Sequence, residues 1–308
     1  MKTVSIVVPV FNEELALGEF YEEICKVRAQ LDGYHLCIIF IDDGSADESL
    51  ELIKKFANED ADVFYLALSR NFGKEKALAA GLDHGFGDAL IPMDVDLQDP
   101  PSMIPIMIEK WSQGYDVILP VRVKRKSDGI FKKISASMFY ALLNRISDVP
   151  IPKQVGDFRL LDRRVVEAIK TMRESERYTK GIFAWAGFAT IEIPFERAQR
   201  VAGKTKFSVR RLVNLALDGV LSFSSSPLRL ITIAGLSSSF LAIGYATYIY
   251  LRTVFYGNPV PGYASLMTIN LVVSSILLFS LGIIGEYLGK IYSEVKNRPI
   301  YVVSESNI

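Results

Sequence analysis

The sequence has little cysteine and little histidine. Its 308 residues include two cysteines, Cys25 and Cys37, and two histidines, His35 and His84. Two cysteines cannot make a disulfide framework, and neither lies near a second cysteine or a histidine at the spacing of a metal site, so we expect a reduced domain that faces the cytosol. The two histidines stand far apart in the sequence. A Ser-His-Asp triad or a histidine-rich metal site would therefore lack parts.

The chain also lacks net charge, because 35 Lys and Arg balance 35 Asp and Glu. This balance argues against a general polyanion binder, and we expect no nucleic-acid partner. Half of the residues are hydrophobic and only 23% are charged, with a mean hydropathy of +0.23. That composition is too apolar for an ordinary soluble enzyme and indicates contact with lipid.

Two runs near the C-terminus are almost free of charge. Residues 230–251 carry none, and residues 266–288 carry only Glu286. At about 1.5 Å per residue each run reaches about 33 Å as a helix, enough to cross a hydrocarbon core of about 30 Å. We therefore predict two membrane helices. A pair of buried core helices is the weaker alternative, since both runs exceed the usual length of globular helices.

Basic residues predict how these helices are oriented. They crowd before the first run and after the second, whereas the connection 252–265 carries one. The positive-inside rule then places both termini and the N-terminal domain in the cytoplasm of an inner (plasma) membrane protein. The basic residues concerned are Lys204, Lys206, Arg210, Arg211, Arg229, Lys290, Lys296 and Arg298.

Before residue 206, short apolar runs alternate with helical patterns. This alternation predicts a parallel sheet covered by helices, in which ligands bind beyond the carboxyl ends of the strands. We expect strands at Val4–Val8, Leu36–Ile41, Val63–Leu68, Ala89–Met93 and Val117–Leu119, and helices at Glu14–Leu31 and Ser49–Glu59.

Polar residues follow three of these strands. The first strand leads into Phe11-Asn12-Glu13, and the second into Asp42-Asp43-Gly44-Ser45. A carboxylate such as Asp42 can accept hydrogen bonds from a uracil or a ribose, while Ser45 or Asp47 can instead cap the next helix. After the fourth strand, Asp94, Asp96 and Gln98 alternate along an extended segment. Two carboxylates and an amide oxygen suit Mg²⁺ or Mn²⁺, with positions left open for a diphosphate.

Five motifs together carry a resemblance to a known family. In order and spacing they resemble the family 2 glycosyltransferases of the GT-A fold, and more narrowly the polyprenyl-phosphate hexosyltransferases, the group with dolichol-phosphate mannose synthase and the bactoprenol-phosphate glucosyltransferases. The motifs are Pro9-Val10-Phe11-Asn12-Glu13, Asp42-Asp43-Gly44-Ser45, Ser69-Arg70-Asn71-Phe72-Gly73-Lys74, Asp94-Val95-Asp96-Leu97-Gln98-Asp99-Pro100-Pro101 and Gly156-Asp157-Phe158-Arg159-Leu160.

The resemblance covers nearly the whole chain and implies its organisation. The fold class is α/β, a GT-A Rossmann-like nucleotide-sugar domain with interfacial amphipathic helices and a C-terminal hairpin of two transmembrane helices. The predicted parts are a cytoplasmic catalytic domain (1–206, with an interfacial helix at about 130–147), an interfacial helix (207–227), the two membrane helices (228–290) and a cytoplasmic tail (291–308).

The resemblance also implies a donor site. The nucleotide sugar would be held by Pro9, Phe11, Glu13, Asp42, Lys74 and Asp94. The metal, Mg²⁺ or Mn²⁺, would be bound by Asp96 and Gln98 with Asp94 in its shell. A divalent ion there would neutralise the charge that grows on the leaving nucleotide.

Cations are expected on the acceptor side, where a lipid monophosphate must reach the sugar. For Arg122 and Arg125 we favour phosphate binding, because a guanidinium pairs two oxygens at once; Lys132 belongs to the same basic cluster. The helical pattern over residues 130–146 predicts an amphipathic helix in the membrane interface. Further along, Arg200 and Lys206 flank Gly203 in a segment similar to the family's mobile basic loop. Gly203 would permit this loop to close over a diphosphate, and Arg200 or Lys206 would then act in catalysis by stabilising the leaving group.

The implied reaction is inverting transfer of a hexose to the phosphate of a polyprenyl lipid, with glucose from UDP-glucose and undecaprenyl phosphate as the first expectation. Asp157 stands at the family's base-like position, although orienting the acceptor or Arg159 is an equal alternative. GDP-mannose and a UDP-aminopentose remain open as donors. The product would serve cell-surface glycan modification, of the O-antigen kind, through a flippase and a downstream glycosyltransferase.

Two other readings are weaker. A processive polysaccharide synthase would need a Gln-x-x-Arg-Trp run, but neither Trp111 nor Trp185 follows an arginine. A non-catalytic nucleotide-sugar-binding scaffold would not need the residues predicted to bind a metal. Gly285 and Gly289 are spaced for close helix packing, which leaves a homo-oligomer open.

Overall fold

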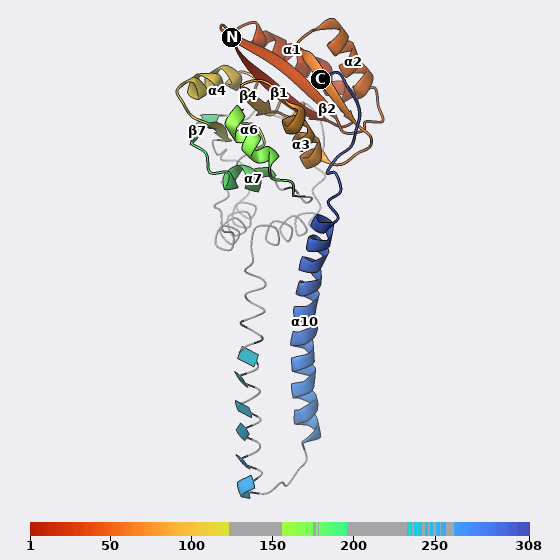
Figure 1. Cartoon of the computed structure of the whole chain (residues 1–308), viewed down its shortest axis with the longest axis vertical. Helices are drawn as coiled ribbons and strands as arrows, with labels where there is room; N and C mark the ends of the chain where they lie inside the picture. The colour runs from red at the N-terminus through yellow and green to blue at the C-terminus, as the bar shows by residue number, and fades with distance from the viewer. Residues whose placement is uncertain are drawn as a thin grey trace, which may run out of the picture. The chain divides into compact units, whose positions relative to one another are not determined.

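The computed structural model describes residues 1–122, 156–174, 177, 179–195, scattered residues between 233 and 256, and residues 262–308. The chain divides into two compact units. One holds a β-sheet and also the residues from Arg298 to the C-terminus, and the other holds the long helix α10 (Tyr263–Val295). Figure 1 shows the C-terminus beside the sheet.

The described residues form an eight-stranded sheet with the order β7-β5-β6-β4-β1-β2-β3-β8. Strands β3, β2, β1 and β4 run parallel, as do β5 and β7, whereas β6 is antiparallel to both of its neighbours and β8 is antiparallel to β3. The strands are β1 (Lys2–Val10), β2 (Tyr34–Asp42), β3 (Val63–Leu68), β4 (Ala89–Pro92), β5 (Val117–Arg122), β6 (Leu160–Asp162), β7 (Thr190–Phe195) and β8 (Val303–Ser306).

Helices cover both faces of this sheet (Figure 1). Helices α1, α2 and α4 pack into one hydrophobic cluster, and α3, α6 and α7 pack into the other. In β1, Ile6 and Val8 belong to the first cluster and Val7 to the second, because successive strand residues face opposite ways. Burial on both faces explains why the central strands are almost continuously apolar. The helices are α1 (Glu14–Arg28), α2 (Ser49–Glu59), α3 (Lys74–His84), α4 (Met103–Ser112), α6 (Arg163–Lys170) and α7 (Thr179–Trp185).

The five predicted strands and both predicted helices are present, with ends that differ by a few residues. The prediction of a parallel sheet is right for its centre and wrong for β6 and β8. The direction of β6 matters for the site. Because β6 is antiparallel to β4, the residues just before β6 lie at the same edge of the sheet as the residues just after β4.

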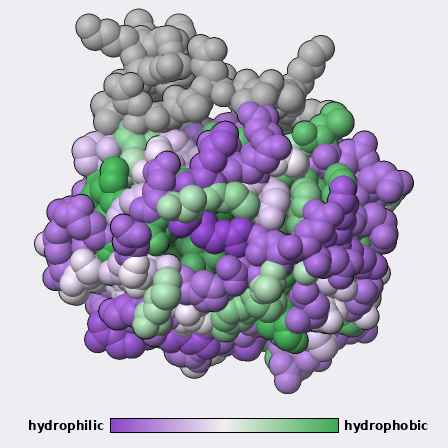
Figure 2. Space-filling model, turned by 90° about the horizontal axis from the view of Figure 1, so that it is seen from above, coloured by the Kyte–Doolittle hydropathy of each residue, from purple (hydrophilic) through white to green (hydrophobic). Residues whose placement is uncertain are grey.

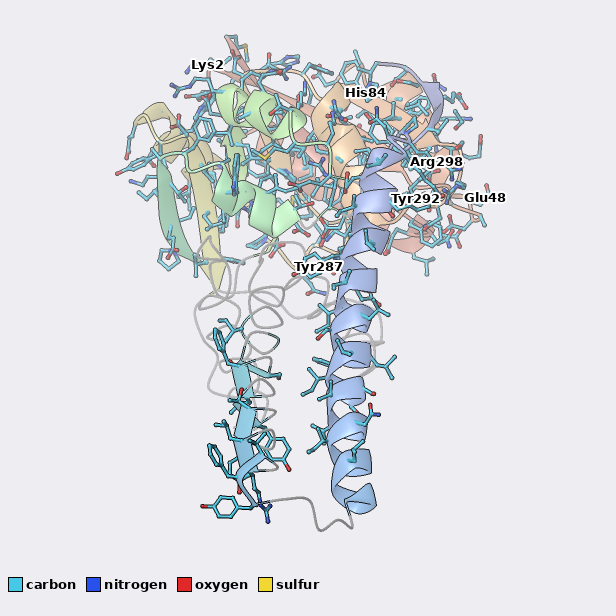
Figure 3. The ribbon with its side chains drawn as sticks, turned by 60° about the horizontal axis from the view of Figure 1, so that its bottom comes forward. Lys2, Glu48, His84, Tyr287, Tyr292 and Arg298 are labelled. Atoms are coloured by element: carbon cyan, nitrogen blue, oxygen red, sulfur yellow. The ribbon has the colours of Figure 1, made fainter. Side chains whose placement is uncertain are left out.

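Helix α10 contains the second predicted membrane segment, 266–288, and extends beyond it at both ends. Among the described residues, one helix is long and apolar enough to cross a membrane, at Val272–Val295. Large apolar side chains on it are exposed, as at Leu277 (65%), Leu278 (70%) and Phe279 (70%). Figure 3 shows side chains on both sides of this helix, with Tyr287 and Tyr292 labelled. An apolar surface of this extent is typical of a helix in contact with lipid.

The described residues within the first predicted membrane segment are helical. The predicted interfacial helices at 130–147 and 207–227 lie outside the described residues. On the face that Figure 2 shows, hydrophilic residues predominate and hydrophobic ones form small patches between them. This face therefore suits contact with water rather than with lipid.

Candidate active site

Two loops at the carboxyl edge of the sheet are tied to each other. The loop after β1 presents Asn12, whose backbone amide donates to Ser45 Oγ (3.0 Å) and whose side-chain oxygen accepts from the Ala46 amide (2.8 Å). The Glu13 amide donates to Ser49 Oγ at the start of α2 (2.9 Å). Ser45 thus fastens the loop after β1 and does not cap α2. These bonds fix the positions of Phe11 and Glu13, which are both exposed.

The adjacent carboxylates Asp42 and Asp43 are both 2% exposed and have separate tasks. Asp42 accepts from the amides of Gly44 and Ser45 (both 3.2 Å) and so shapes its own loop. Asp43 reaches the next loop, where it accepts from the amides of Phe72 (2.7 Å) and Gly73 (2.9 Å). Burial raises the pKa of Asp43, and the two amide donors only partly offset this effect.

Gly44 makes the contact between these two loops possible. Its φ of +71° is in the left-handed region, and a Cβ atom there would lie 2.5 Å from the backbone carbon of Arg70. Only glycine meets both demands, since it has no side chain and adopts positive φ without penalty. The segment Asp42-Asp43-Gly44 therefore connects the loop after β2 to the loop that leads from β3 into α3.

Lys74, the first residue of α3, joins two further segments. Its ammonium lies 2.7 Å from Asp94 Oδ1, after β4, and 2.8 Å from Asp157 Oδ2, before β6. Burial alone would lower the pKa of Lys74, but the charges of Asp94 and Asp157 outweigh it and raise the pKa. One cation thus holds together two carboxylates that are 63 positions apart in the sequence.

Arg159, two residues after Asp157, is 4% exposed. It donates to the carbonyl of Gly156 (2.7 Å), and its guanidinium lies 4.0 Å from the ring centre of Phe183. Burial lowers the pKa of Arg159 to about 10, although the charges of Asp157 and Glu75 oppose the shift. Arg159 therefore remains charged at neutral pH. Its contacts hold the segment that carries Asp157.

The segment after β4 offers oxygen ligands for a cation. Asp96 Oδ1 accepts from the Gln98 amide (3.2 Å), and Leu97 between them has a φ of +52°. Gln98 is 5% exposed, and its side-chain nitrogen has no hydrogen-bond partner among the described residues. The side-chain oxygen of Gln98 and the carboxylates of Asp94 and Asp96 are oxygen ligands of the kind that a hard divalent ion prefers.

Comparison with known proteins identifies the family. Residues 5–170 match the family described as "Glycosyl transferase family 2", and residues 226–291 match the "GtrB C-terminal hairpin". The chain is a family 2 glycosyltransferase.

Its relatives match almost the whole chain. The SfII prophage-derived bactoprenol glucosyl transferase of Shigella flexneri is 47% identical over 99% of this glycosyltransferase and 98% of its own length. The prophage bactoprenol glucosyl transferase homolog of Escherichia coli K12 is 47% identical over 97% and 98%. A solved mannosyltransferase from Pyrobaculum calidifontis, in complex with GDP-Man and Mn²⁺, shares the fold with a TM-score of 0.50 at 17% identity, covering 96% of this chain and 86% of its own.

The glycosyltransferase brings several predicted site residues to one edge of its sheet. Phe11 and Glu13 follow β1, Asp42 is the last residue of the neighbouring strand β2, and Pro9 lies inside β1 opposite Ile41. Arg122 ends β5, paired with Phe195 in the backbone register. The remaining predicted residues, Arg125, Lys132, Arg200 and Lys206, lie outside the described residues.

One site residue of this glycosyltransferase escapes prediction from the sequence. Asp43 has no predicted role, because a carboxylate beside Asp42 gives no signal that it points to a different loop. Only its position, after an apolar run and before Gly44, marks it as the end of a strand.

The expectation that no cysteine stands near a histidine at ligand spacing is wrong. His35 and Cys37 are alternate residues of β2 and face the same side of the sheet. Their ligand atoms and a carboxylate oxygen of Asp62 lie within 4.8 Å of one another, the one such group of three His, Cys, Asp or Glu side chains among the described residues. His35 Nε2 is 2.7 Å from Asp62, and Arg28 is 3.2 Å from the other Asp62 oxygen. Arg28 supplies a cation here, at the edge of the sheet opposite to Lys74, and we interpret the group as an ion-pair cluster.

Proposed function

We propose that this glycosyltransferase moves glucose from UDP-glucose to the phosphate of undecaprenyl phosphate, at the cytoplasmic face of a membrane. The observation that carries this proposal is the near full-length likeness to proteins named bactoprenol glucosyl transferases. The cluster of Lys74, Asp94 and Asp157, at the edge of the sheet where α/β proteins bind nucleotides, supports it.

The donor diphosphate requires positive charge and oxygen ligands. Asp94, Asp96 and Gln98 would hold Mg²⁺ or Mn²⁺, which when bound would neutralise charge on the leaving nucleoside diphosphate. Lys74 contributes a fixed ammonium beside Asp94. Phe11 and Glu13 are exposed next to the buried Asp42, where the uridine is expected. Arg200 and Lys206 would close over the diphosphate.

The chemical step joins one acceptor oxygen to the sugar. A phosphate oxygen of the lipid attacks C1, the bond from C1 to the diphosphate oxygen breaks, and its electron pair leaves with the nucleoside diphosphate. The configuration at C1 inverts, so an α-linked donor gives a β-linked product. Because the phosphate acceptor is already anionic, no strong base is required. Asp157, held by Lys74, would orient the acceptor held by Arg122, Arg125 and Lys132, or serve as a weak base.

The path of the chain supports two membrane spans. Strand β8 follows α10 in the sequence and pairs with β3, so the chain returns to the side of the membrane that holds the sheet. A crossing by α10 therefore requires a second crossing between Phe195 and Tyr263, and residues 230–251 have the length and composition for it. A product made on the cytoplasmic side would then need a flippase and a second glycosyltransferase to reach a cell-surface glycan.

The decisive experiment is transfer of labelled glucose from UDP-glucose to undecaprenyl phosphate by the full chain in detergent, with Mg²⁺ or Mn²⁺ and then with EDTA. We expect a glucosyl lipid that disappears with the chelator and in Asp96→Ala. If product forms only from GDP-mannose or a UDP-aminopentose, the proposed donor is wrong and the proposed type of reaction is right. Nucleotide-sugar binding without transfer from any donor would favour the non-catalytic scaffold.

A second substitution tests the role of Asp157. Asp157→Asn removes the charge and keeps the shape of the side chain. If the folded variant turns over at nearly the wild-type rate, Asp157 is not a base. A loss of turnover with an unchanged KM for the lipid would support the base, while a raised KM for the lipid would support orientation of the acceptor.

A further inference from the structure

The last eleven residues, 298–308, lie outside both matched family segments, which end at residues 170 and 291. Only Lys296 and Asn297 separate them from α10, and Figure 3 labels Arg298 just past the end of that helix. They nevertheless belong to the unit with the sheet. We call residues 298–308 the C-terminal strap.

The strap pairs with the edge of the sheet at β3. Ser306 lies opposite Leu66 and Val303 opposite Leu68, with an irregularity in register between Ala67 and Leu68. One further bond extends the pairing beyond the strand, as the Ser69 amide donates to the Val302 carbonyl (2.9 Å). Leu66 and Ala67 of β3 are thus paired on both sides, and the strap alone continues the pairing through Leu68 to Ser69, the first residue of the loop 69–73.

Side chains fix the strap at two more places. Glu305 accepts from the Tyr65 hydroxyl (2.7 Å) and lies 3.0 Å from the Lys54 ammonium. The Tyr301 hydroxyl donates to Asp83 Oδ2 (2.8 Å) near the end of α3, and Arg173 lies against the same carboxylate (2.5 Å). Tyr301 and Val303 also pack against the hydrophobic cluster that contains α3.

These contacts bracket one functional loop. The strap holds β3 before the loop 69–73 and holds α3 after it, while the loop itself donates the amides of Phe72 and Gly73 to Asp43 and leads into Lys74. We propose that the C-terminal strap is a positioning element of the donor site, which keeps this loop and Lys74 in place and does not touch the substrate.

The physical reason is that β3 would otherwise be an edge strand. Its outward backbone groups would meet water, and the Ser69 amide and the end of α3 would each lose a bond. The loop after β3 would then sample more conformations, and part of the binding energy of the donor would be spent on ordering it. Removal of the strap should therefore weaken donor binding more than it slows the chemical step.

The first test compares hydrogen exchange in the full chain and in a chain that stops after Asn297, both in detergent. We expect faster exchange of the amides at 69–73 in the shortened chain, with α1 unchanged, and a return toward the wild-type rate when a peptide of residues 298–308 is added. Unchanged exchange at 69–73 in a folded shortened chain would overturn the proposal.

The second test uses point variants and does not depend on the shortened chain being stable. Tyr301→Phe keeps the ring and removes the bond to Asp83, and we expect a KM for the donor about fivefold higher with little change in kcat. Tyr115→Phe, at a half-exposed tyrosine, is the matched control. A fall in kcat and thermal stability with the donor KM unchanged would overturn the proposal.

The kinetic test rests on the proposed donor, and the exchange test does not. If UDP-glucose gives no product with the wild-type chain, the proposed function fails, and exchange at 69–73 still decides on the strap. If UDP-glucose is a substrate and neither exchange nor the donor KM changes, the strap proposal alone fails.

Discussion

At the scale of single residues, the charge of Lys74 determines the electrostatics of the site. Asp94 and Asp157 come from different segments and would repel each other without a cation between them. The ammonium of Lys74 lies within 2.8 Å of both carboxylates, and they raise its pKa above the ordinary value even though burial acts in the opposite direction. Lys74 therefore stays charged at neutral pH and well above it.

Replacement of this cation should abolish most activity. We expect Lys74→Met to lower kcat/KM for sugar transfer by about a hundredfold or more, because a fixed charge beside the proposed diphosphate site is lost. Lys55→Met, at an exposed lysine of α2, is the control. Since the pKa of Lys74 is raised, deprotonation of Lys74 should cause no loss of kcat/KM below about pH 10. An alkaline loss well below that pH that is absent in Lys74→Arg would contradict the assignment.

A second residue-scale prediction concerns the contact between the loops after β2 and β3. Gly44→Ala combines a strained φ with a Cβ atom 2.5 Å from Arg70, and should lower the free energy of unfolding by about 3 kcal/mol. Gly33→Ala has a similar positive φ but open space around it, and should cost about 1 kcal/mol. Thermal unfolding of both variants would measure the difference. Equal losses would mean that the loops separate freely.

At the scale of elements, the short strand β6 follows the segment that carries Asp157. Its last residue, Asp162, is also the N-cap of α6. Asp162 accepts from the Arg164 amide (2.9 Å) as the N-cap of α6 and from Trp111 Nε1 (2.8 Å). It thereby fastens α6 to the end of α4. Burial alone would raise the pKa of Asp162, but the donors on Trp111 and Arg164 outweigh burial and lower the pKa.

The lowered pKa predicts how stability depends on pH. The contribution of Asp162 is fully present above the ordinary aspartate value of about 3.9 and is lost as the pH falls through the lower folded-state pKa. We expect Asp162→Asn to unfold more easily at pH 7, by about 1–3 kcal/mol, with a deficit that shrinks in acid. Melting curves from pH 7 to pH 3, with the exposed Glu19→Gln as control, would show it. A deficit that does not shrink would count against the pKa shift.

At the scale of the whole molecule, the pairing of β8 with β3 ties the two ends of the chain to one sheet. The described residues before 196 and after 297 therefore lie on the same side of any membrane that α10 crosses. The basic residues that flank the apolar segments lead independently to the same topology. The two arguments rest on different physics, namely backbone hydrogen bonding and the charge of the membrane surface.

Reporter fusions would test this topology. Green fluorescent protein fused after Ile308 should fluoresce, because it folds in the cytoplasm, and alkaline phosphatase fused there should be inactive. Alkaline phosphatase inserted in the connection 257–261 should be active. An active phosphatase at the C-terminus would place the C-terminus outside the cytoplasm. That result would contradict the topology of two crossings with a cytoplasmic sheet.

The sequence by itself determined the elements and the chemistry available to the site. Apolar runs marked β1 to β5, nearly charge-free runs predicted the membrane segments, and five motifs identified the family and predicted the donor-site residues. These properties are local, because hydrophobic periodicity, turn residues and motif spacing depend on neighbouring positions. The pair His35 and Cys37 is an exception, because two residues that are two positions apart face the same side only when they lie in a strand.

Only the tertiary structure decided which side chains meet. The bridge from Lys74 to Asp94 and Asp157, the reach of Asp43 to the loop 72–73 and the return of residues 303–306 to β3 all join positions far apart in the sequence. Strand β8 is short and exposed, so no hydrophobic period predicts it. It forms because β3 offers unpaired backbone groups at the edge of the sheet, a property of the assembled fold and not of either segment alone.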